Sequence, residues 1–258
     1  MNRIKGKHVV ITGASAGIGE ACARCFASYG ATLTLWARRF ERLENLCAEL
    51  EKQYDVTAVP AGVDVRERSE VEAATHALLE SAGPPAILVN NAGLAAGLSK
   101  IYEGDFEDWD RMIDTNVKGL LNVTRNILPV MVEHDEGHVI NIGSVAGHMV
   151  YPKGNVYNAT KYAVRALSEA MNVDLFGTRV RVSSVDPGAC ETEFSIVRYH
   201  GDGEKAKATY RGFEPLAAED VADAVCYVAN APEHVTIADL VIMPTDQRNP
   251  YLIQRKES

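Results

Sequence analysis

The sequence predicts an α/β fold, a doubly wound parallel sheet of about seven strands with helices on both faces. Three observations lead to this prediction. Strand-like and helix-like segments alternate along the chain, the strand-like segments are apolar throughout, and a glycine-rich turn joins the first strand to the first helix. Strands that are apolar throughout are buried on both sides, so we expect helices to cover both faces of the sheet.

Length and composition indicate the class of protein. A chain of 258 residues, 47% hydrophobic and 24% charged, is typical of a globular protein with one large core. We therefore expect a single domain over residues 1–258. The net charge of -9 argues against nucleic acid or an anionic membrane as a partner, and no apolar run approaches the ~20 residues of a membrane-spanning helix. Five cysteines without a secretory signal favour the reducing cytoplasm.

The first strand and the turn after it indicate a nucleotide site. His8–Thr12 is a short apolar strand, the glycines of Gly13–Gly19 follow, and helical spacing runs from Ile18 to Tyr29. Glycines allow positive φ angles and a close approach of backbone N–H groups, and the helix N-terminus carries partial positive charge that suits a pyrophosphate. The spacing is G-x-x-x-G-x-G instead of the commoner G-x-G-x-x-G. The predicted sheet is therefore Rossmann-like.

The end of the second strand indicates which dinucleotide binds. Thr32–Ala37 is this strand, and Arg38 and Arg39 follow it, about twenty residues after the last glycine. An acidic residue here would bind the ribose 2′-hydroxyl of NAD, whereas arginine neutralises the 2′-phosphate of NADP. We therefore predict NADP. In the alternative, the two arginines are solvated loop charges paired with Glu41 or Glu44.

The middle of the chain continues the alternation of strands and helices. The expected order is a helix over 40–54, a strand over 56–63, a helix opened by a capping box at Ser69–Glu72 and ending near Ala82, a strand over 86–90, and a long helix from about Asp108 to His134. Asn116 and Gly119 are poor residues for the middle of a helix. We therefore expect a local distortion there, which positions a water.

The stretch from Ser144 to Lys161 carries the groups for proton transfer. Ser144 follows the strand predicted over 138–142, so it lies at the carboxyl end of the sheet, where open α/β sheets bind ligands. Tyr157 and Lys161 are four residues apart on the helix predicted over 156–175 and share one face. A tyrosine is a poor base at neutral pH, but a neighbouring ammonium group stabilises its phenolate.

The same helix carries a stripe of small side chains. Such a stripe allows close packing, either on the sheet or against a second subunit. Its members are Ala159, Ala163, Ala166 and Ala170.

The last third of the chain contains two further strands, over 180–185 and 240–243, and a helix over 217–230. Between them, residues 193–213 are polar and only weakly periodic. An irregular loop of that length inside a compact domain is typical of a functional lid. We therefore expect these residues to close over a substrate.

The ordered motifs resemble those of the short-chain dehydrogenases/reductases over nearly the whole chain. They are the glycine turn Thr12–Gly19, the turn Asn90–Gly93, Asn116, Ser144, the Tyr157-x-x-x-Lys161 pair and Pro187-Gly188. The resemblance implies that Tyr157 is the general acid/base and that Lys161 binds the nicotinamide ribose and tunes Tyr157. It implies that Ser144 orients the substrate oxygen and that Asn116 supports a relay water.

The same resemblance implies the residues of an NADP site. Asp64 would contact the adenine and Thr192 the nicotinamide amide. The full set comprises Gly13, Ser15, Gly17, Ile18, Gly19, Arg38, Arg39, Asp64, Asn91, Tyr157, Lys161, Pro187, Gly188 and Thr192.

A narrower set of residues resembles the bacterial NADP-dependent serine and 3-hydroxy acid dehydrogenases. It comprises Ala37–Leu43, Asn90–Gly97, Asp108–Trp109, Met112–Asn116, Gly154–Tyr157, Thr192–Ser195 and Val197–Arg198. The resemblance implies a homotetramer that oxidises L-serine, L-allo-threonine or 3-hydroxypropionate-type acids, or reduces the matching semialdehyde or ketone. That substrate needs a cation for its carboxylate, and Arg198 in the lid is the candidate. The alternative is an exposed lid arginine.

Other substrates and functions fit the same residues. Lys153 stands where we expect a small residue and could add a second contact to the substrate anion. A relative of the same general type reduces sulfoacetaldehyde, so a sulfonate is an alternative to a carboxylate, and a bulkier carbonyl compound is another. A non-catalytic NADP sensor is an alternative from another class, against which the intact Tyr157 and Lys161 argue. His134 and His138 lack a third ligand, so no metal site is expected.

Overall fold

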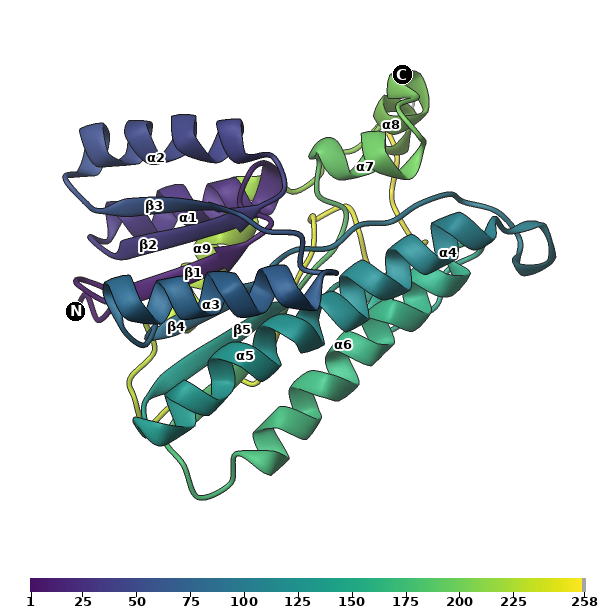
Figure 1. The fold of residues 1–258 in the computed structure, drawn as a ribbon. Coiled ribbons are helices and arrows are strands. Elements are labelled where there is room, and N and C mark those ends of the chain that lie inside the picture. The colour runs from purple at the N-terminus through teal and green to yellow at the C-terminus, as the bar shows by residue number, and fades with distance from the viewer. Residues whose placement is uncertain (257–258) are drawn as a thin grey trace.

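Seven strands form one parallel sheet in the computed structural model, which describes residues 1–256 (Figure 1). Their order across the sheet is β3-β2-β1-β4-β5-β6-β7, and neighbouring strands run parallel. Because β1 and β4 are neighbours, the strand order reverses between them, which places a ligand site at their carboxyl ends. The strands are β1 His8–Thr12, β2 Thr32–Ala37, β3 Ala58–Gly62, β4 Ile87–Asn90, β5 Gly137–Ile142, β6 Val180–Pro187 and β7 Asp239–Ile242.

Helices cover both faces of this sheet (Figure 1). One face carries α1 (Gly17–Ser28), α2 (Phe40–Tyr54) and α9 (Ala218–Ala229). The opposite side carries α3 (Arg68–Ala82), α5 (Leu120–Glu133) and α6 (Asn155–Asp174), and α4 (Phe106–Ile113) packs against α6 beyond the strands (Figure 1). Within residues 1–256, none of the helices combines the length and the apolar character needed to cross a membrane. The predicted fold class, a Rossmann-like doubly wound parallel sheet, is therefore confirmed.

A hydrophobic core lies on each face of the sheet. Successive side chains along a strand point to opposite faces, so neighbouring residues belong to different cores. Val9 and Ile11 of β1 pack with α1, whereas Val10 packs with α5, and all three side chains are fully buried. Burial on both sides explains why the strands are apolar throughout. Because Val185 of β6 packs in the core under α1 and α9, the next residue, Asp186, points to the face that α6 covers.

The long helical segment after β4 is interrupted as the sequence predicts. α4 ends at Ile113, a π-helical turn spans Asp114–Gly119, and α5 begins at Leu120. Gly119 is required in this turn because a Cβ there would lie 2.7 Å from Cγ2 of Val65. The local distortion expected around Asn116 is therefore confirmed, and π-helical turns of this kind occur frequently at functional sites.

The start of α3 differs from the prediction. The helix begins at Arg68 with Glu67 as its N-cap residue, so the capping box predicted at Ser69–Glu72 is wrong. The carboxylate of Glu70 instead accepts a hydrogen bond from the backbone N–H of Asp64, at 2.8 Å. That contact connects the first turn of α3 to the loop that directly precedes it, a pairing that the expected capping box did not include.

Residues 193–213 are not the irregular loop that the sequence predicts. They contain two short helices, α7 (Glu193–Arg198) and α8 (Gly203–Thr209), which lie beyond the carboxyl ends of the strands (Figure 1). The side chains of Thr192 and Asp202 cap these helices, each accepting a hydrogen bond from a backbone N–H of the first turn. Six or seven residues are too few for hydrophobic periodicity to reveal a helix.

The C-terminal tail runs back to the lid helices (Figure 1). The guanidinium group of Arg255 donates hydrogen bonds to the backbone carbonyls of Thr209 and Arg211. The N–H of Lys256 donates to the carbonyl of Gly212 at 2.6 Å. The tail therefore fastens the end of the segment 193–213.

The alanine stripe of α6 faces away from the sheet. Its members are Ala159, Ala163, Ala166 and Ala170, of which Ala163 is partly buried and the others are exposed. On the same helix, Tyr162 is 40% exposed and Val173 is 73% exposed. The stripe thus does not pack on the sheet, and packing against another subunit stays a prediction.

Candidate active site

A cavity of about 560 Å³ lies at the carboxyl ends of the strands and extends from the glycine turn to the lid. It is the place where a doubly wound sheet binds its ligand. Most residues that the sequence predicts for the site line this cavity: Gly13, Ser15, Gly17, Ile18, Arg38, Arg39, Asp64, Asn91, Ser144, Tyr157, Lys161, Pro187, Gly188, Thr192 and Arg198. Residues from both halves of the chain therefore share one cavity.

The glycine turn forms one end of the cavity. Gly13 and Gly17 have φ angles of 67° and 56°, a region that favours glycine. Gly19 has a packing role, because a Cβ there would lie 2.4 Å from the carbonyl oxygen of Gly13. The amide of Asn91 donates to the carbonyl of Thr12 at 2.9 Å and so fixes the turn. The resulting backbone path exposes N–H groups at the start of α1 to a ligand.

The N-terminus of α1 has no side chain that competes for those N–H groups. Its N-cap residue is Ala16, whose methyl group cannot accept a hydrogen bond. Unpaired backbone N–H groups and the helix dipole together favour an anion at this position. This end of the cavity fits a dinucleotide pyrophosphate.

The two arginines after β2 differ in their surroundings. Arg38 is exposed at the rim of the cavity. Arg39 donates to the hydroxyl of Ser15 at 3.1 Å and pairs with Glu193 of α7 at 2.8 Å. The partner is therefore a lid residue, instead of Glu41 or Glu44 of α2. Asp64 lines the same end, and the Arg66 guanidinium, 2.5 Å away, lowers the pKa of its carboxyl group.

Ser144, Tyr157 and Lys161 meet in the middle of the cavity. Ser144 comes two residues after β5, and its hydroxyl accepts a hydrogen bond from the N–H of Ala146 at 3.1 Å. The hydroxyl of Ser144 also donates to the backbone carbonyl of Pro187 at 3.4 Å, and its polarity lowers the pKa of the nearby Tyr157 phenol. Nζ of Lys161 donates to the carbonyl of Ile142 at 2.8 Å and lies 6.0 Å from the centre of the Tyr157 ring. The three side chains therefore line the same part of the cavity, as the sequence predicts.

Burial dominates the electrostatics of this group. Removal from water raises the pKa of Tyr157; the Tyr151 phenol adds to the rise, and the Arg198 guanidinium opposes it. Burial lowers the pKa of Lys161 to about 8, and the carboxylate of Asp186 opposes that change. A cation near Tyr157 favours its phenolate, so the proton affinity of this phenol depends on the charges around it.

Asn116 supports the wall of the cavity from behind. Its side-chain amide donates to the carbonyl of Leu94 and accepts from the N–H of the same residue, both at 2.8 Å. It also donates to the hydroxyl of Thr160 on α6 at 3.0 Å. The side chain thus connects the loop after β4 to α6, and the relay water stays a prediction.

Arg198 lies directly over the proposed acid/base. Its guanidinium carbon is 4.9 Å from the centre of the Tyr157 ring and 5.5 Å from that of Phe194. Its Nη2 donates to the hydroxyl of Tyr151. The lid arginine is therefore directed into the cavity and is not the solvated side chain of the alternative.

Lys153 does not join this group. Its backbone has a φ angle of 66°, and its exposed side chain borders a smaller cavity that Asp105 and Asp108 also line. The structure therefore gives no support to a second anion contact from this lysine. Lys153 is four residues before Tyr157 in the sequence, but it lies outside α6, where the positive φ angle of Lys153 turns the chain away from the site.

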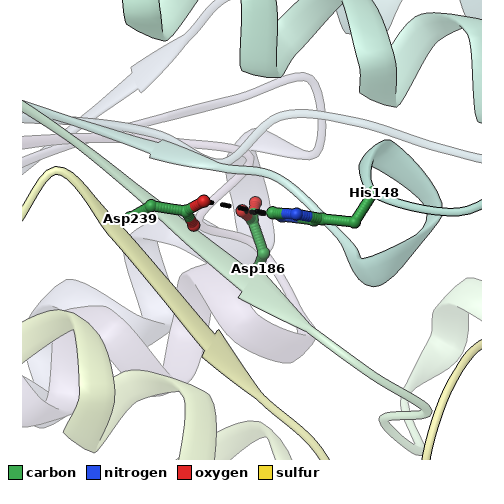
Figure 2. A group of neighbouring side chains, drawn as sticks. All are labelled: His148, Asp186 and Asp239. Atoms are coloured by element: carbon green, nitrogen blue, oxygen red, sulfur yellow. Dashed lines mark hydrogen bonds and ion pairs between the residues drawn. The ribbon is translucent and has the colours of Figure 1, made fainter.

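Three features of the site escaped the sequence analysis. Tyr151, the partner of Arg198, lies in an irregular loop where no periodicity marks it. The tail contributes Gln247 and Ile253 to the wall of the cavity. Behind the site, Asp186 hydrogen-bonds with His148 and borders Asp239 (Figure 2).

The group in Figure 2 is held together by direct contacts. Nε2 of His148 lies 2.7 Å from Oδ2 of Asp186 and 3.8 Å from Oδ2 of Asp239. Their polar atoms all lie within 4.8 Å of one another, a spacing that resembles a metal site. The 2.7 Å hydrogen bond leaves no room for an ion between its two atoms, so hydrogen bonding accounts for the closeness.

Comparison with known proteins identifies the family. Residues 7–201 match the family described as short chain dehydrogenase. The chain belongs to that family. It is 46% identical over 240 residues to the NADP-dependent 3-hydroxy acid dehydrogenase YdfG of Salmonella typhi, which covers 93% of this chain and 95% of the relative. Members of the short-chain dehydrogenase/reductase family are oxidoreductases that act on CH–OH groups, and this chain is one of them.

Two further proteins are comparably similar. Sulfoacetaldehyde reductase 2 of Chromohalobacter salexigens is 46% identical over 241 residues, 93% of this chain and 94% of the relative. A solved structure described as the closed form of serine dehydrogenase complexed with NADP+ is 44% identical, with a TM-score of 0.90, and the match covers 97% of this chain and 100% of that one. The short-chain dehydrogenase/reductase family thus includes relatives that differ in the substrate they are named for.

Proposed function

We propose that this NADP-dependent short-chain dehydrogenase/reductase interconverts a small 3-hydroxy acid, of the serine, allo-threonine or 3-hydroxypropionate type, with its semialdehyde or ketone. One observation carries the proposal: the guanidinium carbon of Arg198 lies 4.9 Å from the ring centre of Tyr157. A cation at that position would bind the substrate carboxylate while the substrate hydroxyl meets the phenol. Relatives named for 3-hydroxy acid and serine dehydrogenation support the same substrate class.

The hydrogen bonding of Arg198 leaves a donor for the anion. Its Nε is buried and has no partner among the residues that the structure describes. A buried donor without an acceptor costs about 1–3 kcal/mol. A bound carboxylate would satisfy this donor and neutralise the charge, which supports Arg198 as the substrate-binding cation.

Tyr157, Ser144 and Lys161 divide the proton chemistry. In the direction of oxidation, the phenolate of Tyr157 takes the proton of the substrate hydroxyl, and in reduction the phenol returns it. Ser144 hydrogen-bonds with the same substrate oxygen and holds it beside the phenol. The ammonium group of Lys161 binds the nicotinamide ribose and stabilises the phenolate. Bound NADP supplies the hydride acceptor or donor, which no side chain provides.

The other end of the cavity fits the rest of NADP. Gly13 and Gly17 shape the turn around the pyrophosphate, as their positive φ angles require. Arg38 and Arg39 bind the 2′-phosphate, because both line the cavity at the end of β2. Asp64 lies next to the adenine in this arrangement, with the carboxylate held by Arg66.

A sulfonate is the second candidate anion. The chain is 46% identical both to a 3-hydroxy acid dehydrogenase and to a sulfoacetaldehyde reductase, so overall similarity favours neither. A guanidinium group forms charge-assisted hydrogen bonds with either anion. Bulkier carbonyl compounds are a third candidate class, because the lid determines how large a substrate fits.

A substrate panel tests the proposal. The purified protein with NADP is assayed by absorbance against 3-hydroxy acids, 3-hydroxy amino acids, hydroxy sulfonates and simple alcohols of equal length. We expect the anionic compounds to have a kcat/KM at least about tenfold above that of the neutral alcohols, since a charge-assisted hydrogen bond contributes about 1.5–3 kcal/mol. Equal values for charged and neutral compounds would refute the substrate class. No hydride transfer at all would favour the non-catalytic NADP sensor.

We also infer a homotetramer in the cytoplasm. The exposed alanines and the exposed Tyr162 and Val173 give α6 an apolar outer face that suits another copy of the chain. The five cysteines are free thiols, which fits a reducing compartment. Light scattering on the purified protein measures the assembly, and a monomeric mass would exclude it.

A further inference from the structure

A buried carboxylate lies directly behind the proposed catalytic residues. Asp186 is 1% exposed and is the β6 residue that precedes Pro187. In the β5–β6 register Ile142 pairs with Val185, so Asp186 lies beside Gly143. Gly143 stands between Ile142, whose carbonyl accepts the hydrogen bond of Lys161, and Ser144.

Gly143 leaves room for this carboxylate. A Cβ at that position would lie 1.6 Å from Oδ1 of Asp186, so a side chain there would expel it. Because Ile142 packs in the core under α1 and α9, the missing side chain of Gly143 would point to the opposite face, under α6. Lys161 reaches the sheet from α6 on that face. The carboxylate and the ammonium group thus occupy the same layer of the molecule.

Neighbours on two elements fix the orientation of the carboxylate. The hydroxyl of Ser184 donates to Oδ1 of Asp186 at 2.8 Å, and His148, which follows the short turn after Ser144, hydrogen-bonds with Oδ2 at 2.7 Å (Figure 2). Both oxygens are therefore engaged. These two hydrogen bonds give the carboxylate a defined position.

The second carboxyl group of the cluster is the more exposed one. The side chain of Asp239 is 41% exposed, whereas that of Asp186 is 2% exposed. Burial, together with the hydrogen bond and the charge of Asp186, raises the pKa of Asp239 to about 6, while His148 and Arg165 oppose the rise. As the pH falls toward 6, Asp239 takes up a proton, which relieves the repulsion between the two carboxyl groups.

The charge of Asp186 acts on both groups of the proton chemistry. It opposes the lowering of the pKa of Lys161 by burial, and it adds to the rise of the pKa of Tyr157 that burial causes. The other charged or titratable groups that face Asp186 are His148 after Ser144, Asp239 on β7 and Lys161 on α6 itself. Arg165, one turn further along α6, acts on Asp239.

We propose that Asp186, held by His148 and Ser184, is a positioning residue that keeps Lys161 protonated and determines the pH range in which Tyr157 exchanges protons. The proposal rests on the proposed function, because it requires the assigned roles of Lys161 and Tyr157. A buried ammonium group whose hydrogen bond goes to a neutral carbonyl needs a counter-charge. Asp186 provides that charge without entering the cavity, so it stays clear of substrate and cofactor.

Asp186→Asn tests the proposal, because the amide keeps the shape and removes the charge. Without the negative charge, both the phenol of Tyr157 and the ammonium group of Lys161 lose their protons at lower pH. The pH profile of kcat/KM for oxidation should therefore move as a whole, both limbs shifting by about one pH unit toward acid. A variant whose kcat/KM falls at every pH while neither limb of the profile moves would overturn the proposal. A merely structural role lowers the maximum of the profile and leaves its position on the pH axis unchanged.

A second measurement does not depend on turnover. If protonated Lys161 binds the ribose, the Kd for NADP, followed by cofactor fluorescence, rises as Lys161 loses its proton. In Asp186→Asn this rise should begin about one pH unit lower than in the unsubstituted protein. An unchanged pH dependence of the Kd would contradict the proposal even if the protein oxidises none of the tested substrates. The absence of turnover would instead count against the proposed function.

Asp239→Asn is the matched control. It removes the same charge from the same cluster, but at the more exposed position, and should leave both limbs of the profile where they are. A shift equal to that of Asp186→Asn would attribute the effect to general negative charge and overturn the role of Asp186. His148→Ala, which removes one hydrogen bond of the carboxylate, should shift the profile in the same direction by a smaller amount.

Discussion

The catalytic floor and the lid of this cavity are held in place by different means. The floor (Ser144, Tyr157 and Lys161) is at most 9% exposed, and Ser144 and Lys161 hydrogen-bond to buried backbone groups. The proposed lid (residues 193–213) is held in part by hydrogen bonds to Tyr151 and to the C-terminal tail, and in part by ion pairs at the surface. Glu193 pairs with both Arg39 and Arg42 at 2.8 Å, and these three side chains are 45–50% exposed.

This difference teaches which region controls rate and which controls binding. Buried hydrogen bonds are costly to leave unmade, so the floor has one geometry. Exposed ion pairs contribute about 0–1 kcal/mol each, so breaking those of Glu193 costs little. Substitutions in the floor should therefore change the rate of the chemical step, and substitutions in the lid should change the affinity for substrate or cofactor.

The largest expected effect comes from the floor. Tyr157→Phe removes the proposed acid/base and keeps the ring, so we expect kcat to fall by about 10²- to 10⁴-fold. The Kd for NADP, measured by fluorescence, should stay within about twofold, because a cofactor contact through Lys161 remains. Tyr162→Phe, on the same helix and 40% exposed, is the matched control and should keep full activity. Residual turnover near that of the control would show that another group transfers the proton.

A smaller effect is expected from the lid residue nearest the floor. Arg198→Met keeps the length of the side chain and removes its charge, so KM for an anionic substrate should rise about 10- to 100-fold, the equivalent of a lost charge-assisted hydrogen bond. The kcat should change less, since Tyr157 and Lys161 remain. Arg211→Met alters an exposed arginine of the same segment and serves as the control. A fall in kcat at constant KM would instead mean that Arg198 acts in the chemical step, as the floor residues do, and not in substrate binding.

The smallest expected effect concerns the attachment of the lid. Glu193 competes with the cofactor for Arg39, so Glu193→Gln should tighten NADP about two- to fivefold, the range of an exposed ion pair. The Kd for NAD, which has no 2′-phosphate, should hardly change. Glu191→Gln removes an equal charge two residues earlier and controls for net charge. Equal tightening of both cofactors would mean that Arg39 does not bind the 2′-phosphate.

The sequence predicted the fold and the floor well because both depend on local patterns. The apolar runs of β1 and β5 required burial on both sides, and the glycine spacing of the turn from Gly13 to Gly19 required a close backbone approach. Tyr157 and Lys161 lie four apart on one helix, so their common face followed from helix geometry alone. The poor helix formers Asn116 and Gly119 likewise indicated the π-helical turn before any contact was known.

Long-range contacts decided what the sequence left open. Arg198 was a candidate with the alternative of an exposed arginine until the fold directed it over Tyr157. Lys153 was a candidate until the structure placed its side chain at another cavity. Such contacts join residues without fixed spacing, so periodicity carries no signal of them.

The sequence by itself therefore determined the sheet, the glycine turn and the common helix face of Tyr157 and Lys161, because each depends on spacing within one or two neighbouring elements. The tertiary structure alone decided that Arg198 lies over Tyr157, how residues 193–213 are fastened and where the carboxylate of Asp186 lies. The β5–β6 register and the missing side chain of Gly143 bring that carboxylate beneath α6. Electrostatics of a buried site depend on distances through space, and only the folded chain determines those distances.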